Sequence, residues 1–255
     1  HLSILLFFYL LFRKTFMKIL SNLVASALVF LLLTSFKTDR INGSGTIITR
    51  NPDVSNFEEI EVANYCNIEV YQDNTYSVQV SEYENIMQYL KFEVVGKKLI
   101  ISTEPENISI SNSRAKAVIH MPDVLRKLTV SGSSDITLKS GFKDISYLNI
   151  SGSGNIIGEK PSTMNKVKAM VAGSGRITML GTANTVNLHT IGSGNIVFSG
   201  VKAQNGNCRI DGSGDIKVNL SSTLDATING SGYVIYSGNP TVTKTINGSG
   251  MLVNK

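Results

Sequence analysis

The sequence predicts an all-β protein: a parallel β-helix (solenoid) of about 20-residue rungs with a less regular N-terminal meander as its cap. Three observations predict this fold. A Gly-Ser-Gly motif recurs at a near-constant interval, apolar residues alternate with polar ones on both sides of it, and no long 3.6-residue apolar period follows the cap. Because a unit this short cannot bury its apolar face alone, equivalent units must stack.

The Gly-Ser-Gly motif marks the corners of the rungs. It starts, with small variations, at Gly43, Gly132, Gly152, Gly173, Gly192, Gly212, Gly230 and Gly248. From the second start onward the spacings are 20, 21, 19, 20, 18 and 18 residues. Glycine permits corner angles that other residues avoid, and Gly and Ser leave room for one rung to lie directly on the next.

The segments beside each corner read as short strands with one buried face. Apolar residues mostly stand four and two positions before the first glycine, and again four and six positions after it. We therefore expect Ile136, Ile156, Ile177 and Ile196 to share one interior column. A second turn signal closes most units, at Gly141, Gly181, Gly200 and Gly238. An up-and-down barrel or a sandwich is the competing architecture, but neither needs the same corner chemistry at a constant period.

The part before Gly132 is less regular and is expected to cap one end of the stack. Residues 60–70 fit the repeat, with Asn64 and Cys66 in place of the two corner glycines. Residues 78–101 read as meander strands with a turn at Gly96 and a short helical turn around residues 85–90. Regular rungs are expected over about 117–255.

The N-terminal residues read as a leader. Residues 17–36 form a predicted signal peptide, since the apolar run 23–33 is shorter than the roughly 20 residues that span a bilayer. Residues 1–16 are interpreted as an upstream segment preceding a start at Met17. The alternative is a double-hydrophobic leader that stays in the membrane. No cysteine stands directly after the apolar run, so no lipid anchor is expected at that point. The mature protein is predicted to reach the periplasm, the outer surface or the medium.

Composition argues against several classes of function. The chain has 24 Lys and Arg against 19 Asp and Glu, without the dense basic stripe and stacking aromatics of nucleic-acid binding. Cys66 and Cys208, far apart, fit neither a disulfide scaffold nor a zinc site, and a bridge between them is not expected. Three histidines, one of them His1, leave few residues for histidine-based catalysis. No catalytic residue, metal or cofactor is therefore predicted.

A column of Asp and Asn follows the corners, at Asp135, Asn155, Asn195 and Asp215. A glycosidase pair needs its carboxyl groups about 5–9.5 Å apart. Asp135 and Asp215 are expected four rungs apart, or roughly 19 Å. We therefore expect the column to form hydrogen bonds with the backbone at each turn. His120 and His189 are expected on outward positions without a local acidic partner.

Two outward columns are candidate binding faces. The first, three residues before each corner, includes Met170 and the candidate binding residues Thr129, Asn149, His189, Arg209, Thr227 and Thr245. The second, five residues after the first glycine of each corner, runs through Thr137, Ile157, Thr178, Val197, Lys217 and Ile235. Repeating donors at rung spacing suit a polysaccharide or a partner protein, and they equally suit a plain solenoid exterior.

The chain resembles the putative auto-transporter adhesin head GIN domain family over roughly residues 41–255. The resemblance lies in the opening Phe57–Val62, the turn and strand Gly96–Ile101, and the corners Gly152–Ile156, Gly192–Ile196 and Gly212–Ile216. It implies an exported envelope or surface protein with a β-helical fold, and it brings no catalytic set. Departures are Asn64 and Cys66 at one corner, and Arg176, Tyr233 and Met251 where other rungs carry Asn or Asp.

Together these observations predict an exported, non-enzymatic cell-envelope or surface protein that acts as an adhesin-like binding module. The alternatives are a β-helical polysaccharide-degrading enzyme and a periplasmic structural or sensing module. The expected partner is a glycan or a surface or envelope protein, with membrane contact through the leader alone. The ligand and the oligomeric state do not follow from the sequence.

Overall fold

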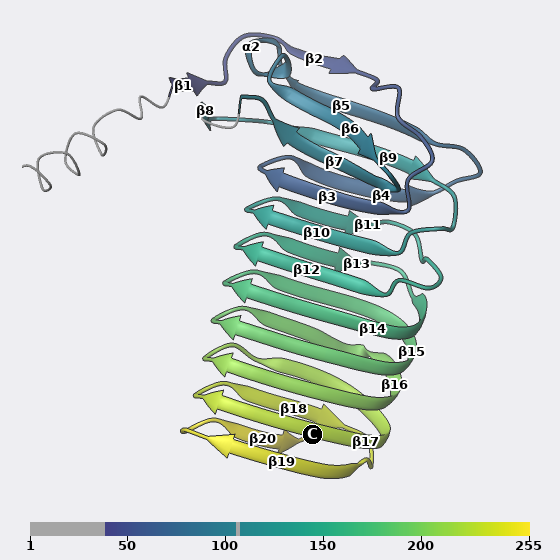
Figure 1. Ribbon diagram of the computed structural model, residues 1–255, viewed down its shortest axis with the longest axis vertical. Coiled ribbons are helices and arrows are strands. Elements are labelled where there is room, and N and C mark those ends of the chain that lie inside the picture. The colour runs from purple at the N-terminus through teal and green to yellow at the C-terminus, as the bar shows by residue number, and fades with distance from the viewer. Residues whose placement is uncertain (1–38, 106–107) are drawn as a thin grey trace, which may run out of the picture. The chain divides into compact units, whose positions relative to one another are not determined.

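The protein is a β-solenoid whose coils stack along one axis (Figure 1). The computed structural model describes residues 39–105 and 108–255, and Ile41–Lys255 form one compact unit. The predicted signal peptide and upstream segment lie outside the described residues. Among the described helices, none has the length and apolar character needed to cross a membrane.

Two series of strands stack in parallel, one before each corner and one after it. The first series is β7 (Lys98–Thr103), β3 (Glu59–Asn64), β10 (Lys127–Gly132), β12 (Tyr147–Gly152), β14 (Ser162–Gly173), β15 (Arg176–Gly192), β16 (Asn195–Gly212), β17 (Ile216–Gly230) and β19 (Thr241–Asn247). The second is β9 (Lys116–Met121), β4 (Asn67–Gln72), β11 (Asp135–Leu138), β13 (Asn155–Gly158), the first parts of β15 to β17, β18 (Tyr233–Ser237) and β20 (Met251–Asn254). The predicted parallel β-helix is confirmed.

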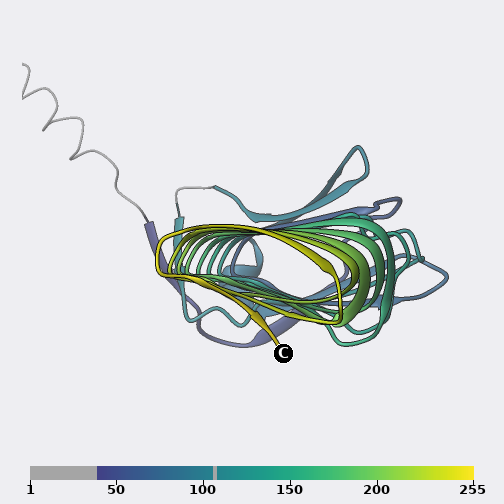
Figure 2. The ribbon, with the colours of Figure 1, turned by 90° about the horizontal axis from the view of Figure 1, so that it is seen from below.

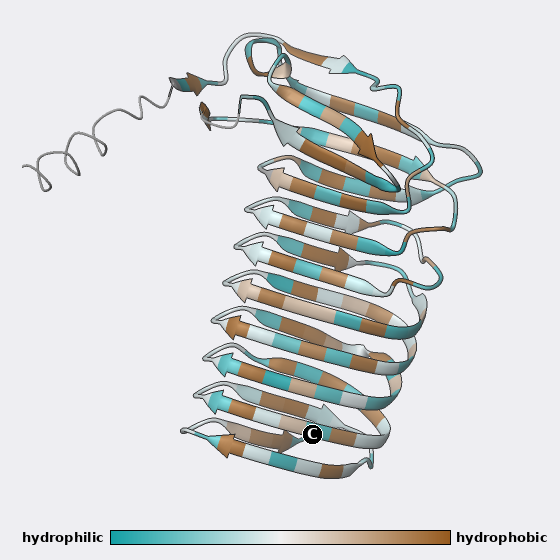
Figure 3. Ribbon diagram, viewed as in Figure 1, coloured by the Kyte–Doolittle hydropathy of each residue, from teal (hydrophilic) through white to brown (hydrophobic). Residues whose placement is uncertain are grey.

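The core is a set of columns of apolar side chains inside the coils. Ile136, Ile156, Ile177 and Ile196 are successive partners in the parallel ladder, and each is 0% exposed. Figure 2 shows the coils superposed around a common interior, and Figure 3 shows apolar and polar residues alternating along the strands. The predicted interior column is therefore confirmed.

Each corner is held to the next by the carbonyl group of its first glycine. The Gly132 carbonyl oxygen accepts hydrogen bonds from the backbone N–H groups of Ser153 and Gly154, at 2.9 and 3.1 Å. The contact is so close that a Cβ on Gly152, whose φ is +137°, would lie 2.2 Å from that oxygen. Glycine is required here both for its backbone angle and for the approach of the rung below.

The Asn and Asp column adds a second link between rungs. The Asp135 carboxylate accepts the backbone N–H of Asn155 at 2.9 Å, and the Asp215 carboxylate accepts that of Tyr233 at 2.9 Å. The column does bond to backbone N–H groups, but these belong to the following rung and not to the residue's own turn, which differs from the expectation. The column therefore ties neighbouring coils together.

The second bend of the later rungs differs from the expected turn. β15 and β16 are 17 and 18 residues long and continue through Gly181 and Gly200 without a break. The ladder between them shifts register between Thr178 and Leu180, and between β16 and β17 it shifts between Phe198 and Lys202. Bulges of this kind bend a strand while most of its ladder persists.

The N-terminal cap closes one end of the stack with antiparallel pairing. β5 (Ser77–Tyr83) pairs with β2 (Ile47–Arg50) and β9, and β6 (Leu90–Val95) pairs with β7. β1 (Asp39–Asn42) pairs with β8 (Ile108–Ser111), and the expected helical turn is α2 (Glu84–Met87). The coil of β3 and β4 lies between the level of β7 and β9 and that of β10 and β11.

A buried carboxylate organises this cap. Glu82 is 0% exposed and accepts the backbone N–H groups of Tyr83 and Arg114, at 2.6 and 3.0 Å, together with the Ser113 hydroxyl. Burial, with the nearby Glu82 carboxylate as the second cause, raises the pKa of the Cys66 thiol to about 12. Since a buried charge is tolerated when its oxygens are hydrogen-bonded, Glu82 fixes the segment that leads into β9.

The C-terminal end of the stack carries a charge at an inward position. In the column four residues before the corner, Leu188, Cys208 and Ala226 are buried, and the next partner is the exposed Lys244. An inward charge on an edge strand is a known means of preventing further strand addition.

We predict that Gly152→Ala lowers the midpoint of thermal unfolding by roughly 6–12 °C, because about 3 kcal/mol or more is lost through the clash with Gly132 and the positive φ. The matched control is Gly45→Ala, where φ is also positive (+90°) but no atom lies within 4 Å of the added Cβ. Circular dichroism measures both variants. Equal losses would show that backbone angle alone, and not stacking, requires glycine.

We also predict that Lys244→Leu promotes self-association through the terminal rung, since it removes the inward charge and extends an apolar column. Light scattering over a concentration series should show a rising mass for this variant. Lys202→Leu adds the same side chain on an outward position away from the end and should leave the mass unchanged. An unchanged mass for Lys244→Leu contradicts the role given to this lysine.

Candidate functional site

The predicted column three residues before each corner is one continuous ladder. Parallel pairing joins Thr129, Asn149, Met170, His189, Arg209, Thr227 and Thr245 in that order. None of these side chains is buried. The geometry that the sequence predicts for this column is therefore present, and its use as a binding face stays a prediction.

His189 lies in a hydrogen-bonded network centred on Asp211. The His189 Nε2 atom is 2.8 Å from Asp211 Oδ2, and the Arg209 guanidinium donates to both carboxylate oxygens at 2.7 and 2.8 Å. Asn229, on the following rung, donates to Asp211 Oδ1 at 2.7 Å. Arg209 first, then the Asn229 and His189 bonds, hold the pKa of the Asp211 carboxyl well below its usual range.

Neither histidine is paired with a local acidic residue, as expected, but the fold gives each one a distant acidic partner. Asp211 is 22 residues from His189 in sequence, and only the stacking of rungs brings the two together. The His120 Nδ1 atom likewise lies 3.2 Å from Asp73 Oδ2, and its ring stacks on Tyr71 with 5.2 Å between centroids. Both histidines are partly exposed, as expected. Their partners hold them in place on the solenoid surface.

The other candidate chemical groups are not assembled into a reactive site. Asp135 and Asp215 lie four rungs apart in the ladder, too far for a carboxylate pair. Cys66 and Cys208 are free and buried, and burial raises the pKa of the Cys208 thiol to about 12, with Asp225 as the second cause. In the described part of the chain, no three His, Cys, Asp or Glu side chains gather in a way that would hold a metal ion.

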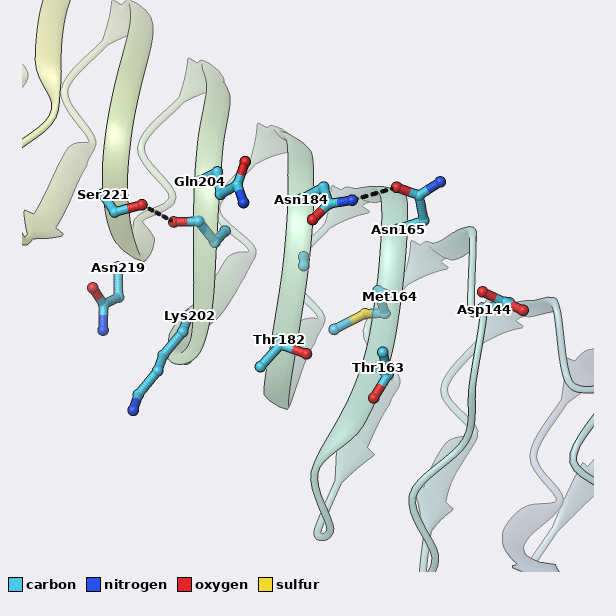
Figure 4. A pocket seen from close by; sticks show the side chains of 12 residues that line it. Asp144, Thr163, Met164, Asn165, Thr182, Asn184, Lys202, Gln204, Asn219 and Ser221 are labelled. Atoms are coloured by element: carbon cyan, nitrogen blue, oxygen red, sulfur yellow. Dashed lines mark hydrogen bonds between the residues drawn. The ribbon is translucent and has the colours of Figure 1, made fainter.

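A groove of about 620 Å³ crosses the rungs at the second bend (Figure 4). Its floor is apolar and made of Met164, Ala183 and Ala203, which are 3%, 6% and 5% exposed and are successive ladder partners. The lining continues onto the next rung with Asn219 and Ser221, on either side of the buried Leu220 that pairs with Ala203. The groove therefore follows the stacking direction over four rungs.

Two rows of polar side chains flank this floor. Thr163, Thr182, Lys202 and Asn219 form one row, and Asn165, Asn184, Gln204 and Ser221 form the other, as Figure 4 shows. The Asn184 amide donates to Asn165 Oδ1 at 2.7 Å, and the Ser221 hydroxyl donates to the Ala203 carbonyl at 3.4 Å. Asp144 lies at one end of the groove. The groove thus offers hydroxyl and amide groups at rung spacing on both sides of an apolar strip.

Sequence reasoning missed this groove because it counted positions from the Gly-Ser-Gly corner. The bulges before the second bend shift that count, so the groove residues fall in different columns of the sequence repeat. A signal is nevertheless present. A polar–apolar–polar triplet recurs as Thr163-Met164-Asn165, Thr182-Ala183-Asn184, Lys202-Ala203-Gln204 and Asn219-Leu220-Ser221.

The Asp211 network predicts a pH-dependent stability. Because the folded pKa of Asp211 lies below its ordinary value of about 4, the stabilisation is complete above that pH and is lost as the pH falls toward the folded pKa. We expect Asp211→Asn to lower the free energy of unfolding by about 1–2 kcal/mol at pH 7. This difference between the variant and the unmodified protein should shrink below about pH 4.

Melting curves at pH 7 and pH 3 measure this gap. Asp225→Asn is the matched control, since Asp225 is exposed and no hydrogen bond or ion pair is recorded for it among the described side chains. A gap that is the same at both pH values would contradict the role assigned to Asp211.

Comparison with solved structures supports the fold at high coverage. A putative adhesin from Bacteroides fragilis is 27% identical, with a TM-score of 0.75, and the match covers 84% of this chain and all of that one. A protein from Parabacteroides distasonis, described as a putative lipid binding protein, is 27% identical with a TM-score of 0.71, over 85% of this chain and all of its own. A putative adhesin from Parabacteroides merdae is 20% identical with a TM-score of 0.68, and the match covers 86% of this chain and all of the Parabacteroides merdae chain. At this identity the likeness supports the fold alone.

Among curated proteins, no sequence matches the chain. The family model described as "Putative auto-transporter adhesin, head GIN domain" matches residues 56–240, which include most of the cap, the corners from Gly132 to Gly230 and both rows of the groove. Because this match spans more than half of the chain, the chain belongs to the putative auto-transporter adhesin, head GIN domain family.

Proposed function

We propose that this protein is an exported, non-enzymatic cell-envelope or surface protein, an adhesin-like module that binds an extended glycan along the groove of the second bend. The family and the Bacteroides fragilis neighbour are both described as putative adhesins, which supports a binding role. Export is proposed from the leader predicted in residues 17–36 and from the family description.

One observation carries the choice of ligand: two rows of polar side chains lie on either side of an apolar floor, and the row of Thr163, Thr182, Lys202 and Asn219 is in register along the ladder. Successive rungs are about 4.8 Å apart, which is close to the length of one sugar in an extended glycan. Each sugar can therefore meet an equivalent set of groups. The hydroxyl and amide side chains pair with sugar hydroxyls, and Met164, Ala183 and Ala203 contact the apolar C–H face of the ring.

The lining favours holding a glycan over cleaving it. Glycoside hydrolysis uses two carboxyl groups placed on either side of the scissile bond. Of the twelve residues recorded along the groove, Asp144 at one end is the one that carries a carboxylate, and Lys202 is the one cation. The alternative of a polysaccharide-degrading enzyme would need a second acidic group here.

We predict that Asn184→Ala combined with Gln204→Ala weakens glycan binding about tenfold or more, because two hydrogen-bonding groups leave the same row. A glycan array identifies a bound oligosaccharide, and calorimetry compares the variants. The matched control is Asn187→Ala with Asn207→Ala, which removes two polar side chains from the same strands on the face before the corner.

Two outcomes would count against the proposal. If no glycan binds, or if both double variants bind equally well, the groove is not the site, and the periplasmic structural or sensing module is favoured. If incubation releases shorter oligosaccharides, the enzyme alternative replaces the non-enzymatic function.

A further inference from the structure

A second hollow lies on the face formed by the strands that follow the corners. It consists of two adjoining parts of about 270 and 100 Å³, which share Val197 and Lys217 as lining residues. None of its lining residues lines the groove of the second bend. We call it the basic cleft. It is a separate feature of the molecule, on the rungs from β15 to β18 and close to the C-terminal Lys255.

Three cations surround the basic cleft: Arg176, Lys217 and Lys255. All three are exposed, and no ion pair is recorded for them among the described residues. The backbone N–H of Lys255 donates to the Tyr236 carbonyl at 2.9 Å, which holds this residue at the cleft. Three unpaired cations around one hollow favour an anionic ligand.

The negative charge within the cleft does not neutralise these cations. Asp215 is the side-chain carboxylate in the lining, and one of its oxygens already accepts the backbone N–H of Tyr233 at 2.9 Å. The α-carboxylate of Lys255 is a second negative group on a lining residue, so three cations outnumber two anions. Over all faces of the rungs from residue 160 to residue 255, the chain contains nine Lys and Arg against three Asp and no Glu, a surplus of six positive charges. A second copy of the chain would bring the same positive charge to this face, so self-association there is disfavoured.

The uncharged lining distinguishes between anionic ligands. Val197 and Ile235 flank Lys217 in one ladder and give the cleft aliphatic surface, to which the half-buried Tyr236 adds a ring. Ser199, Ser237 and Asn195 place hydroxyl and amide groups among them. An acyl chain would leave these polar groups unused, whereas a sugar ring uses apolar surface and hydrogen-bonding groups together.

From these observations we propose that the basic cleft binds a carboxylate-bearing sugar of an acidic glycan. Lys217 and Lys255 contact the carboxylate, and Arg176 extends the positive surface along the chain of sugars. Val197, Ile235 and Tyr236 pack against the ring, and the serine hydroxyls bond to its hydroxyl groups. This site differs in place and in ligand charge from the groove, so each stands or fails without the other.

Calorimetry with a uronic acid oligosaccharide and its methyl ester tests the proposal, since esterification removes the negative charge of each carboxyl group and adds one methyl group there. The acid is expected to bind, the ester to bind about tenfold more weakly or worse, and the affinity to fall as salt is raised. Lys217→Gln with Lys255→Gln is expected to weaken binding of the acid about tenfold or more. Lys160→Gln with Lys168→Gln removes the same total charge outside the cleft and should leave most of the affinity.

Four outcomes would overturn the proposal. They are equal binding of acid and ester, equal losses in the two double variants, displacement of the acid by inorganic phosphate at matched ionic strength, and binding of phosphatidylglycerol vesicles through the same lysines when the oligosaccharide does not bind. The Asn184→Ala and Gln204→Ala variant, which alters the groove, should bind the acid as the unmodified protein does.

Discussion

The structure depends on one close approach, in which the carbonyl oxygen of each corner glycine accepts N–H groups of the next rung where no Cβ could fit. At Gly132 and Gly152 this approach leaves 2.2 Å for an added carbon. Because the same contact recurs along the stack, it sets which residue of one rung faces which residue of the next. The interior isoleucine column and the hydrogen bonds from Asp135 and Asp215 follow from that alignment.

Every candidate binding surface of the protein is a product of the same alignment. A residue in one rung lies beside residues about 20 positions away in the sequence. Short polar side chains that are far apart in the sequence therefore form continuous rows on the surface. The groove combines two such rows around a floor of Met164, Ala183 and Ala203. The basic cleft places Lys217 between Val197 and Ile235 in a single ladder. A rigid repeating surface suits ligands that also repeat, because each unit meets the same contacts without reorganisation.

A stack of this kind has two open ends, and they are protected in different ways. At the N-terminal end, antiparallel strands cover the edge, and the buried Glu82 fixes the segment that leads back into the coil. At the C-terminal end the column of apolar side chains finishes at Lys244, an inward charge that discourages another strand from adding. The two ends differ in the number of residues that protect them, since the cap uses several strands and the C-terminal end uses one lysine.

The sequence by itself determined the repeat, the β-solenoid, the glycine corners and the identity of the buried columns, because the steric demand of the corner and the alternation of apolar residues are local properties. It also placed Thr129 through Thr245 in one outward column. The tertiary structure alone decided which polar residues meet across rungs. The His189–Asp211 contact joins residues 22 positions apart, and the groove depends on bulges before Gly181 and Lys202 that shift the register. The position of β3 and β4 likewise depends on long-range pairing. After these two strands the chain builds the cap, and it then returns to continue the stack with β10 and β11. These features arise from contacts between coils, and a pattern read along one coil does not contain them.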